Sequence, residues 1–199
     1  MSSIKKSIIY VFTFALLGGL ITGAYLAIKH PKDSKQVSSP IIEKIIPVVS
    51  INNSIIKPYV DEDITILKNY YDWQQKENQP DSLIFYNNTY MQNTGVIYGR
   101  NEEFNVINIA DGEIIRVDDN ELAGKTVEIR YSDDVIGIYH FVTDVNLKAN
   151  DHIKQGAIIG KSSISNLVDN TKNQLYFELI IKGELVNPEN YYGKSINEL

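Results

Sequence analysis

The sequence predicts a mainly β protein, with a small antiparallel β-domain behind a single N-terminal transmembrane helix. From residue 84 onward, short runs rich in valine, isoleucine and tyrosine alternate with turn residues, and no segment of helical length and periodicity interrupts them. Near the N-terminus, a 22-residue run carries no charge. The expected strands span residues 104–109, 113–117, 126–131, 135–143, 157–159 and 175–181.

Composition limits the functions open to this chain. Its 199 residues include no cysteine, which excludes a disulfide framework, a thiolate metal site and a cysteine nucleophile. The formal net charge is −6, but residues 1–35 carry five lysines and one aspartate, so the remaining chain carries −10. A body this acidic repels a phosphate backbone, and we expect no nucleic-acid partner.

The uncharged run from Ser7 to Ile28 is long enough to cross a membrane, since a helix of that length spans about 33 Å. A cleaved signal peptide is the competing interpretation, but no small-x-small cleavage site follows the run, so we favour an uncleaved anchor. Lysines flank both ends, and their count does not decide the orientation. The short tail of residues 1–6 favours a cytoplasmic N-terminus and an exported C-terminal domain.

Between the predicted anchor and the β-domain lie two shorter segments. Residues 29–58 hold four of the six prolines, which is typical of an extended stalk. Residues 59–83 are expected to pack on the domain as an accessory segment. Within it, Ile64 to Leu67 fits both a helical and a strand pattern, and the sequence leaves that choice open. The domain itself is expected over residues 84–199.

Three landmarks of the β region share the order and spacing of one family. The run from Asn93 to Tyr98, NTGVIY, is similar to the pattern H-x-G-x-D-Y, and the run from Asn150 to Gly160 is similar to G-D-x-V-K-x-G-x-x-I-G. The run from Gln174 to Leu179, QLYFEL, is similar to H-L-H-F-E-I. Over residues 84–192 the chain therefore resembles the LytM domains of the M23 family of zinc peptidases, which cut peptidoglycan cross-bridges.

The resemblance also indicates what this chain lacks. Zinc needs imidazole and carboxylate donors and one open position for water. The family's ligand positions fall on Asn93, Ile97 and Tyr176, and its two auxiliary histidines fall on Phe141 and Gln174. None of these side chains suits the role, so we predict no metal site, no catalytic residue and no cofactor. The chain is interpreted as a pseudopeptidase.

One histidine lies close to a family position. His140 directly follows Tyr139, but the register from the later motif places the family's histidine at Phe141. Because adjacent residues on a strand point to opposite faces, we expect His140 to point away from the former site. The two other histidines, His30 and His152, are assigned no role.

A narrower resemblance concerns the stretch from Pro58 to Tyr98. Behind one membrane span, it is similar to the sporulation branch of the family. That resemblance implies a forespore membrane protein whose degenerate LytM domain lies between forespore and mother cell. There it would bind the exported domain of stage III sporulation protein AH and help build a channel; a higher-order ring and peptidoglycan binding are left open. The alternatives are a non-catalytic regulator of a cell-wall amidase and an active zinc endopeptidase using Asp144 or Asp151.

Overall fold

The computed structural model describes residues 54–120, 124–165, 167–168 and 171–199, and these residues form mostly β-strands. The predicted span from Ser7 to Ile28 and most of the predicted stalk lie outside the described residues. No helix within the described ranges is long and apolar enough to cross a membrane.

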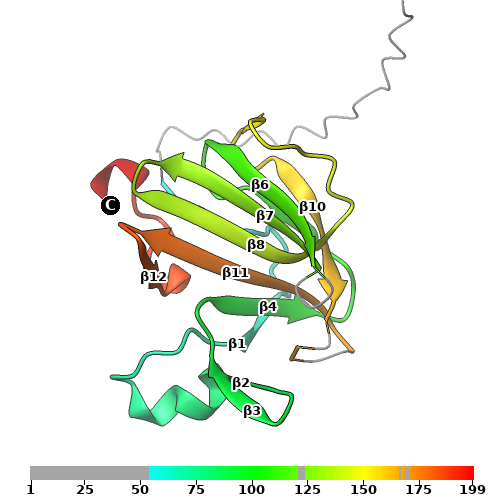
Figure 1. The fold of residues 1–199 in the computed structure, drawn as a ribbon, viewed down its shortest axis with the longest axis vertical. Coiled ribbons are helices and arrows are strands. Elements are labelled where there is room, and N and C mark those ends of the chain that lie inside the picture. The colour runs from blue at the N-terminus through cyan, green and yellow to red at the C-terminus, as the bar shows by residue number, and fades with distance from the viewer. Residues whose placement is uncertain (1–53, 121–123, 166, 169–170) are drawn as a thin grey trace, which may run out of the picture. The chain divides into compact units, whose positions relative to one another are not determined.

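A ten-stranded antiparallel sheet dominates the domain (Figure 1). Its main path runs through β1 (Thr65–Lys68), β4 (Val96–Arg100), β11 (Asn173–Ile181), β10 (Ile158–Ile164), β8 (Val135–Thr143), β7 (Gly124–Ser132), β6 (Gly112–Asn120) and β9 (His152–Ile153). Off this path, β5 (Asn105–Ile107) pairs with β10, and β12 (Glu184–Val186) pairs with β11. Three short 3-10 turns complete the described elements: η1 (Lys76–Ser82), η2 (Pro188–Asn190) and η3 (Ile196–Glu198). The predicted antiparallel β architecture is confirmed, and β8 has the predicted bounds.

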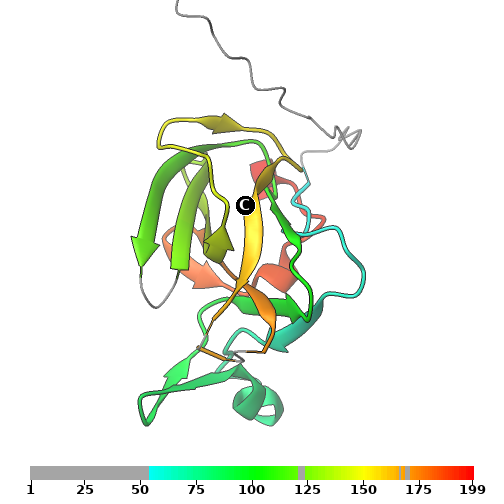
Figure 2. The ribbon, with the colours of Figure 1, turned by 90° about the vertical axis from the view of Figure 1, so that its right-hand side faces the viewer.

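A second sheet consists of one hairpin, β2 (Leu83–Tyr86) and β3 (Thr89–Gln92). Asn87 and Asn88 both have φ near +50° to +60°, the conformation that a two-residue hairpin turn requires. Figures 1 and 2 show this hairpin beyond β1 and β4, at the end of the domain where those strands lie.

The hydrophobic core lies on one face of the curved main sheet. In β11 the residues Leu175, Phe177 and Leu179 are fully buried, while the residues between them face the other side. This is the two-residue alternation of a strand with one buried face. The ring of Phe177 packs 4.8 Å from that of Tyr139 in the neighbouring strand β8, measured between centroids.

The structure corrects the predicted stalk at its C-terminal end and decides the open choice for Ile64 to Leu67. Residues 54–58 pack on the domain: Ile55 is 1% exposed, and its N–H donates to the carbonyl of Lys194 at 2.8 Å. The proline content of the segment predicted an extended stalk. The prediction was wrong for residues 54–58, because burial of Ile55 in the core holds them against the domain. The ambiguous stretch forms strand β1, which pairs with β4.

Gly95 permits β4 and β11 to approach closely. A Cβ at this position would lie 2.2 Å from the carbonyl oxygen of Phe177, too close for any side chain. Because that oxygen belongs to the central strand β11, relief of the clash would require the two strands to separate.

We expect Gly95→Ala to lower the free energy of unfolding by about 3 kcal/mol, the upper range for overpacking a rigid site. Gly183→Ala is the matched control. Its φ of +81° strains an alanine, but no atom lies within 4 Å of the added Cβ, so a loss of about 1 kcal/mol is expected. Urea denaturation of both variants measures the difference, and equal losses would contradict the close-approach role of Gly95.

Candidate functional site

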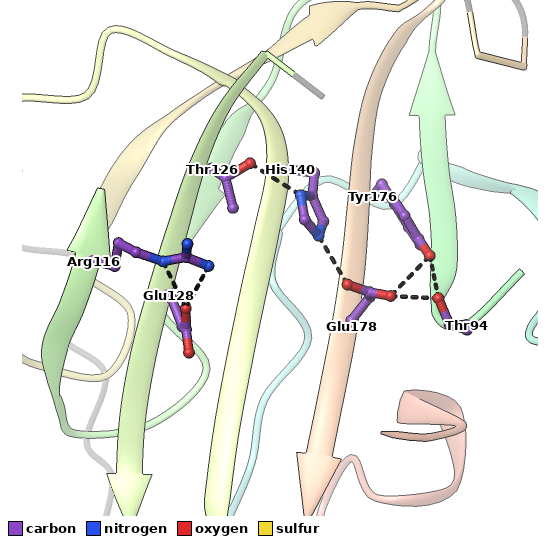
Figure 3. A network of polar contacts seen from close by, with 7 residues as sticks. All are labelled: Thr94, Arg116, Thr126, Glu128, His140, Tyr176 and Glu178. Atoms are coloured by element: carbon purple, nitrogen blue, oxygen red, sulfur yellow. Dashed lines mark hydrogen bonds and ion pairs between the residues drawn. The ribbon is translucent and has the colours of Figure 1, made fainter. Parts of the chain in front are cut away.

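The predicted site residues lie on or beside the outer face of β11, which is the face turned away from the main hydrophobic core. Tyr176 lies opposite Ile97 of β4 on one side and opposite His140 of β8 on the other. Because directly opposed residues of antiparallel strands share a face, these three side chains lie in one row across the sheet. Figure 3 shows the polar part of this row.

A β-bulge in β8 brings His140 and Phe141 to the same side of the sheet. On β7 only Thr126 stands between the partners of Val142 and Tyr139, whereas two residues of β8 occupy that interval. Phe141 has a φ of +62°, which breaks the normal alternation. The His140 ring stacks on Tyr176 at 5.0 Å, and the Phe141 ring lies 6.0 Å from it.

The prediction that His140 points away from the site residues was therefore wrong. It assumed a regular strand, in which neighbours point to opposite faces. The extra residue of the bulge cancels one alternation, so His140 adjoins Tyr176 while Phe141 fills the space behind it.

Apolar side chains fill the space around three of the predicted positions. Ile97 and Phe141 are at most 1% exposed and form a second, smaller hydrophobic cluster with Ile84 and Leu167, which we call the apolar cluster. Tyr176 packs against its edge. Ile84 comes from the hairpin β2–β3, so the apolar cluster anchors this hairpin beside Ile97, which the motif spacing assigned to a zinc-ligand position.

The two remaining positions are buried and turned toward backbone carbonyls. Asn93 donates through Nδ2 to the carbonyl of Asn69 at 2.8 Å, and Gln174 donates through Nε2 to that of Ser165 at 3.1 Å. Among the described residues, Oδ1 of Asn93 has no hydrogen-bond partner. Both amides therefore hold loop backbone in place.

A polar network lies beside the apolar cluster and consists of Thr94, Thr126, His140, Tyr176 and Glu178 (Figure 3). Nε2 of His140 lies 2.9 Å from Oε2 of Glu178, and its Nδ1 lies 3.0 Å from the Thr126 hydroxyl. Tyr176 donates to Oε1 of Glu178 at 2.9 Å, and Thr94 donates to the same oxygen. Because a carboxylate only accepts, Nε2 of His140 carries the proton that is donated to Glu178.

The network sets the ionisation of its members. Burial alone raises the pKa of the Glu178 carboxyl, but the hydrogen bonds from His140, Thr94 and Tyr176 outweigh burial, and the net pKa is lowered. Burial raises the pKa of the Tyr176 phenol, and the nearby charge of Glu178 raises it further. Tyr176 is therefore a neutral hydrogen-bond donor and Glu178 a charged acceptor at neutral pH.

These residues do not fit the zinc ion that the M23 fold implies. The ligand positions offer one amide oxygen, one aliphatic side chain and one protonated phenol, and no imidazole or carboxylate among them can neutralise a dication. Within the described ranges, no group of three histidine, cysteine, aspartate or glutamate side chains lies close enough to share a metal ion. A cleft of about 400 Å³ does exist between β6, β7 and β9, but it is lined by none of the predicted site residues.

Sequence reasoning missed Thr94 and Glu178 as members of the site. Both lie within the motifs that carry the resemblance, and Glu178 follows Tyr176 by two residues, which puts it on the same face of β11. That spacing was a usable signal for Glu178. The contact between Glu178 and His140 could not be predicted from the sequence, because the side on which His140 lies was judged without the β-bulge in β8.

Comparisons with known proteins agree with this geometry. Residues 91–188 match the model of peptidase family M23. Stage II sporulation protein Q of Bacillus subtilis (strain 168) is 26% identical over 150 residues, which cover 73% of this chain and 53% of that protein. The chain thus matches about half the length of this curated relative.

Solved structures give the same result. A chain of the SpoIIQ–SpoIIIAH pore-forming complex matches with a TM-score of 0.68 and 26% identity, covering 73% of this chain and 94% of that chain. The catalytic domain of the prophage-encoded M23 protein EnpA from Enterococcus faecalis matches with a TM-score of 0.51 and 20% identity, covering 68% and 97%. At 20% identity, the match to EnpA shows only that the two folds are similar.

Fold and motifs together are similar to those of the LytM-type β-domains of peptidase family M23. More narrowly, the domain is similar to that of stage II sporulation protein Q.

We expect Ile97→Asp to lower the free energy of unfolding by at least about 3 kcal/mol, because it buries a carboxylate in the apolar cluster. The control Ile97→Val removes one methylene and should cost about 0.5–1.5 kcal/mol. Thermal unfolding with and without zinc measures both. A folded Ile97→Asp protein whose Tm rises on adding zinc would show that the position still belongs to a metal site.

We expect Glu178→Gln to cost about 1–3 kcal/mol at pH 7, because a charged acceptor for three donors is lost. The folded-state pKa of Glu178 lies below its ordinary value of 4.5, so its stabilisation is present above that pH and lost as pH falls further. The gap between wild type and variant should therefore narrow below pH 4.5.

The control for this variant is Glu128→Gln. Glu128 pairs with Arg116, whose side chain is 57% exposed, so a loss of at most about 1 kcal/mol is expected. Urea denaturation over a pH series distinguishes the two. A stability gap for Glu178→Gln that is independent of pH would refute the charged role of Glu178.

Proposed function

We propose that this chain is a membrane-anchored, non-catalytic LytM protein that acts as an interaction scaffold in sporulation. It binds the exported domain of a stage III sporulation protein AH-like partner and contributes to a channel between forespore and mother cell. The anchor is the span from Ser7 to Ile28, with the N-terminus in the cytoplasm.

The likeness to a chain of the SpoIIQ–SpoIIIAH complex carries this proposal, because the match extends over 94% of that chain. A second solved SpoIIIAH–SpoIIQ complex matches with a TM-score of 0.65 over 99% of the chain concerned. Nearly the whole length of the matched chain in each complex thus has a counterpart here.

The site supports a binding role over a catalytic one. Hydrolysis by an M23 enzyme needs a metal-bound water, and the donors that would hold the metal are replaced by Asn93, Ile97 and Tyr176. Ile84 of the hairpin belongs to the same buried cluster as Ile97, so hydrocarbon occupies this point. A protein with this arrangement can hold a partner without cutting it.

The test uses the full-length chain purified in detergent. We expect a stoichiometric complex with the exported domain of the AH-like partner by titration calorimetry, no stoichiometric zinc by elemental analysis, and no muropeptides released from purified peptidoglycan. An M23 enzyme with intact ligands serves as the positive control. Stoichiometric zinc with muropeptide release would establish an endopeptidase, and recovery of an amidase without the AH-like protein from sporulating cells would establish a regulator.

A further inference from the structure

The hairpin β2–β3 has two faces with different surroundings. Ile84 on the inner face is 4% exposed and belongs to the apolar cluster, and Tyr86 packs against the same cluster. On the outer face, Phe85 and Tyr90 are directly opposed, and their side chains are 54% and 69% exposed. An isolated two-stranded hairpin is only marginally stable, so the inner-face anchor is what holds the outer face in a defined position.

The exposed aromatic pair is unusual on this surface. No two of the other exposed large apolar residues in the described ranges are register partners; these are Val60, Ile66, Trp73, Met91, Ile158, Ile164 and Leu185. Singly exposed apolar residues are normal, whereas a paired, rigidly held aromatic surface indicates a binding site. Met91, next to Tyr90 and 38% exposed, is the register partner of Ile84 and lies on the other face of the hairpin.

The charge pattern indicates what kind of occupant fits. Residues 83–92, LIFYNNTYMQ, contain no charged side chain, although the chain after residue 35 carries −10. Depletion of charge with enrichment of tyrosine, phenylalanine and methionine is the composition of a protein–protein interface core. An anionic membrane surface does not fit, because the hairpin offers no lysine or arginine to attract it.

Ring geometry favours a protein over a glycan. The Phe85 and Tyr90 rings lie 4.8 Å apart between centroids and are tilted by 43°, so they pack on one another as a ridge. A ridge of this kind inserts into a recess between side chains, whereas the flat faces of sugar rings need a flat platform.

We propose that the outer face of β2–β3, centred on Phe85 and Tyr90, is the surface on which the exported domain of the AH-like partner docks. This docking site rests on the proposed function and adds its location and chemistry. The partner supplies an uncharged recess that takes the two rings. Two aromatic side chains bury about 300–500 Å², less than the roughly 800 Å² per partner of a standard interface, so the pair is a hot spot within a larger contact.

The experiment measures Kd by calorimetry between the full-length chain in detergent and the exported partner domain. The double variant Phe85→Ser/Tyr90→Ser should bind about 100-fold more weakly. Tyr90→Lys, which places a charge in the dry centre, should lose a similar factor and serves as a second, independent variant. Trp73→Ser is the matched control, because Trp73 is 72% exposed on a different segment. Tyr90→Phe keeps the ring and should bind as wild type does.

Urea midpoints confirm that each variant is folded, since the substituted side chains are exposed. Weaker binding of the double and Tyr90→Lys variants, with Trp73→Ser and Tyr90→Phe unchanged, supports the docking site. If wild type binds and the double variant binds equally well, the docking site is wrong and the proposed function stands. If wild type does not bind, the proposed function fails and the docking site fails with it. If the double variant instead lowers the oligomeric mass of the chain or its retention on peptidoglycan, with partner binding unchanged, the hairpin serves another contact and the inference is overturned.

Discussion

The pairing of β11 with β4 on one side and β8 on the other is the constraint on which the rest of the domain depends. A strand paired along both edges has a fixed register, and a slip of one residue would exchange its two faces. Because the register is fixed, Leu175, Phe177 and Leu179 enter the core while Tyr176 and Glu178 face the site. Gly95 belongs to the same constraint, since only a residue without a side chain permits the approach to Phe177.

Chemistry can change on such a framework without a change of fold. At two positions that the motif spacing assigned to the M23 site, Ile97 and Phe141 contribute apolar volume. Full burial of each such side chain is worth about 1.5–3 kcal/mol, so this cluster stabilises the domain without a metal ion. The charge that remains, on Glu178, is satisfied by neighbouring hydroxyls and by His140.

The predictable part of the structure is the part governed by local pattern. The strand 135–143 was found with its bounds because alternating apolar residues and the turn at Asp133-Asp134 delimit it. Motif spacing also selected Ile97 and Tyr176, which the structure places opposite one another on β4 and β11. The facing of His140 did not follow from such a pattern, because a bulge depends on how β7 and β8 are paired and not on the sequence of β8 alone. The burial of Ile55 was missed for a related reason, since its partner near Lys194 is distant in the chain.

The apolar cluster connects the proposed non-catalytic role of the domain with the proposed docking surface on the hairpin. A catalytic groove must stay open to admit substrate and water, so its floor cannot anchor a neighbouring element. Once Ile97 and Phe141 close that floor, Ile84 can pack on it, and the hairpin β2–β3 gains the tertiary support that a two-stranded sheet lacks by itself. Rigid support lowers the entropy lost on binding, because Phe85 and Tyr90 are already held in place before a partner arrives. Ile97 and Phe141 therefore also preorganise the outer face of the hairpin, through their contact with Ile84.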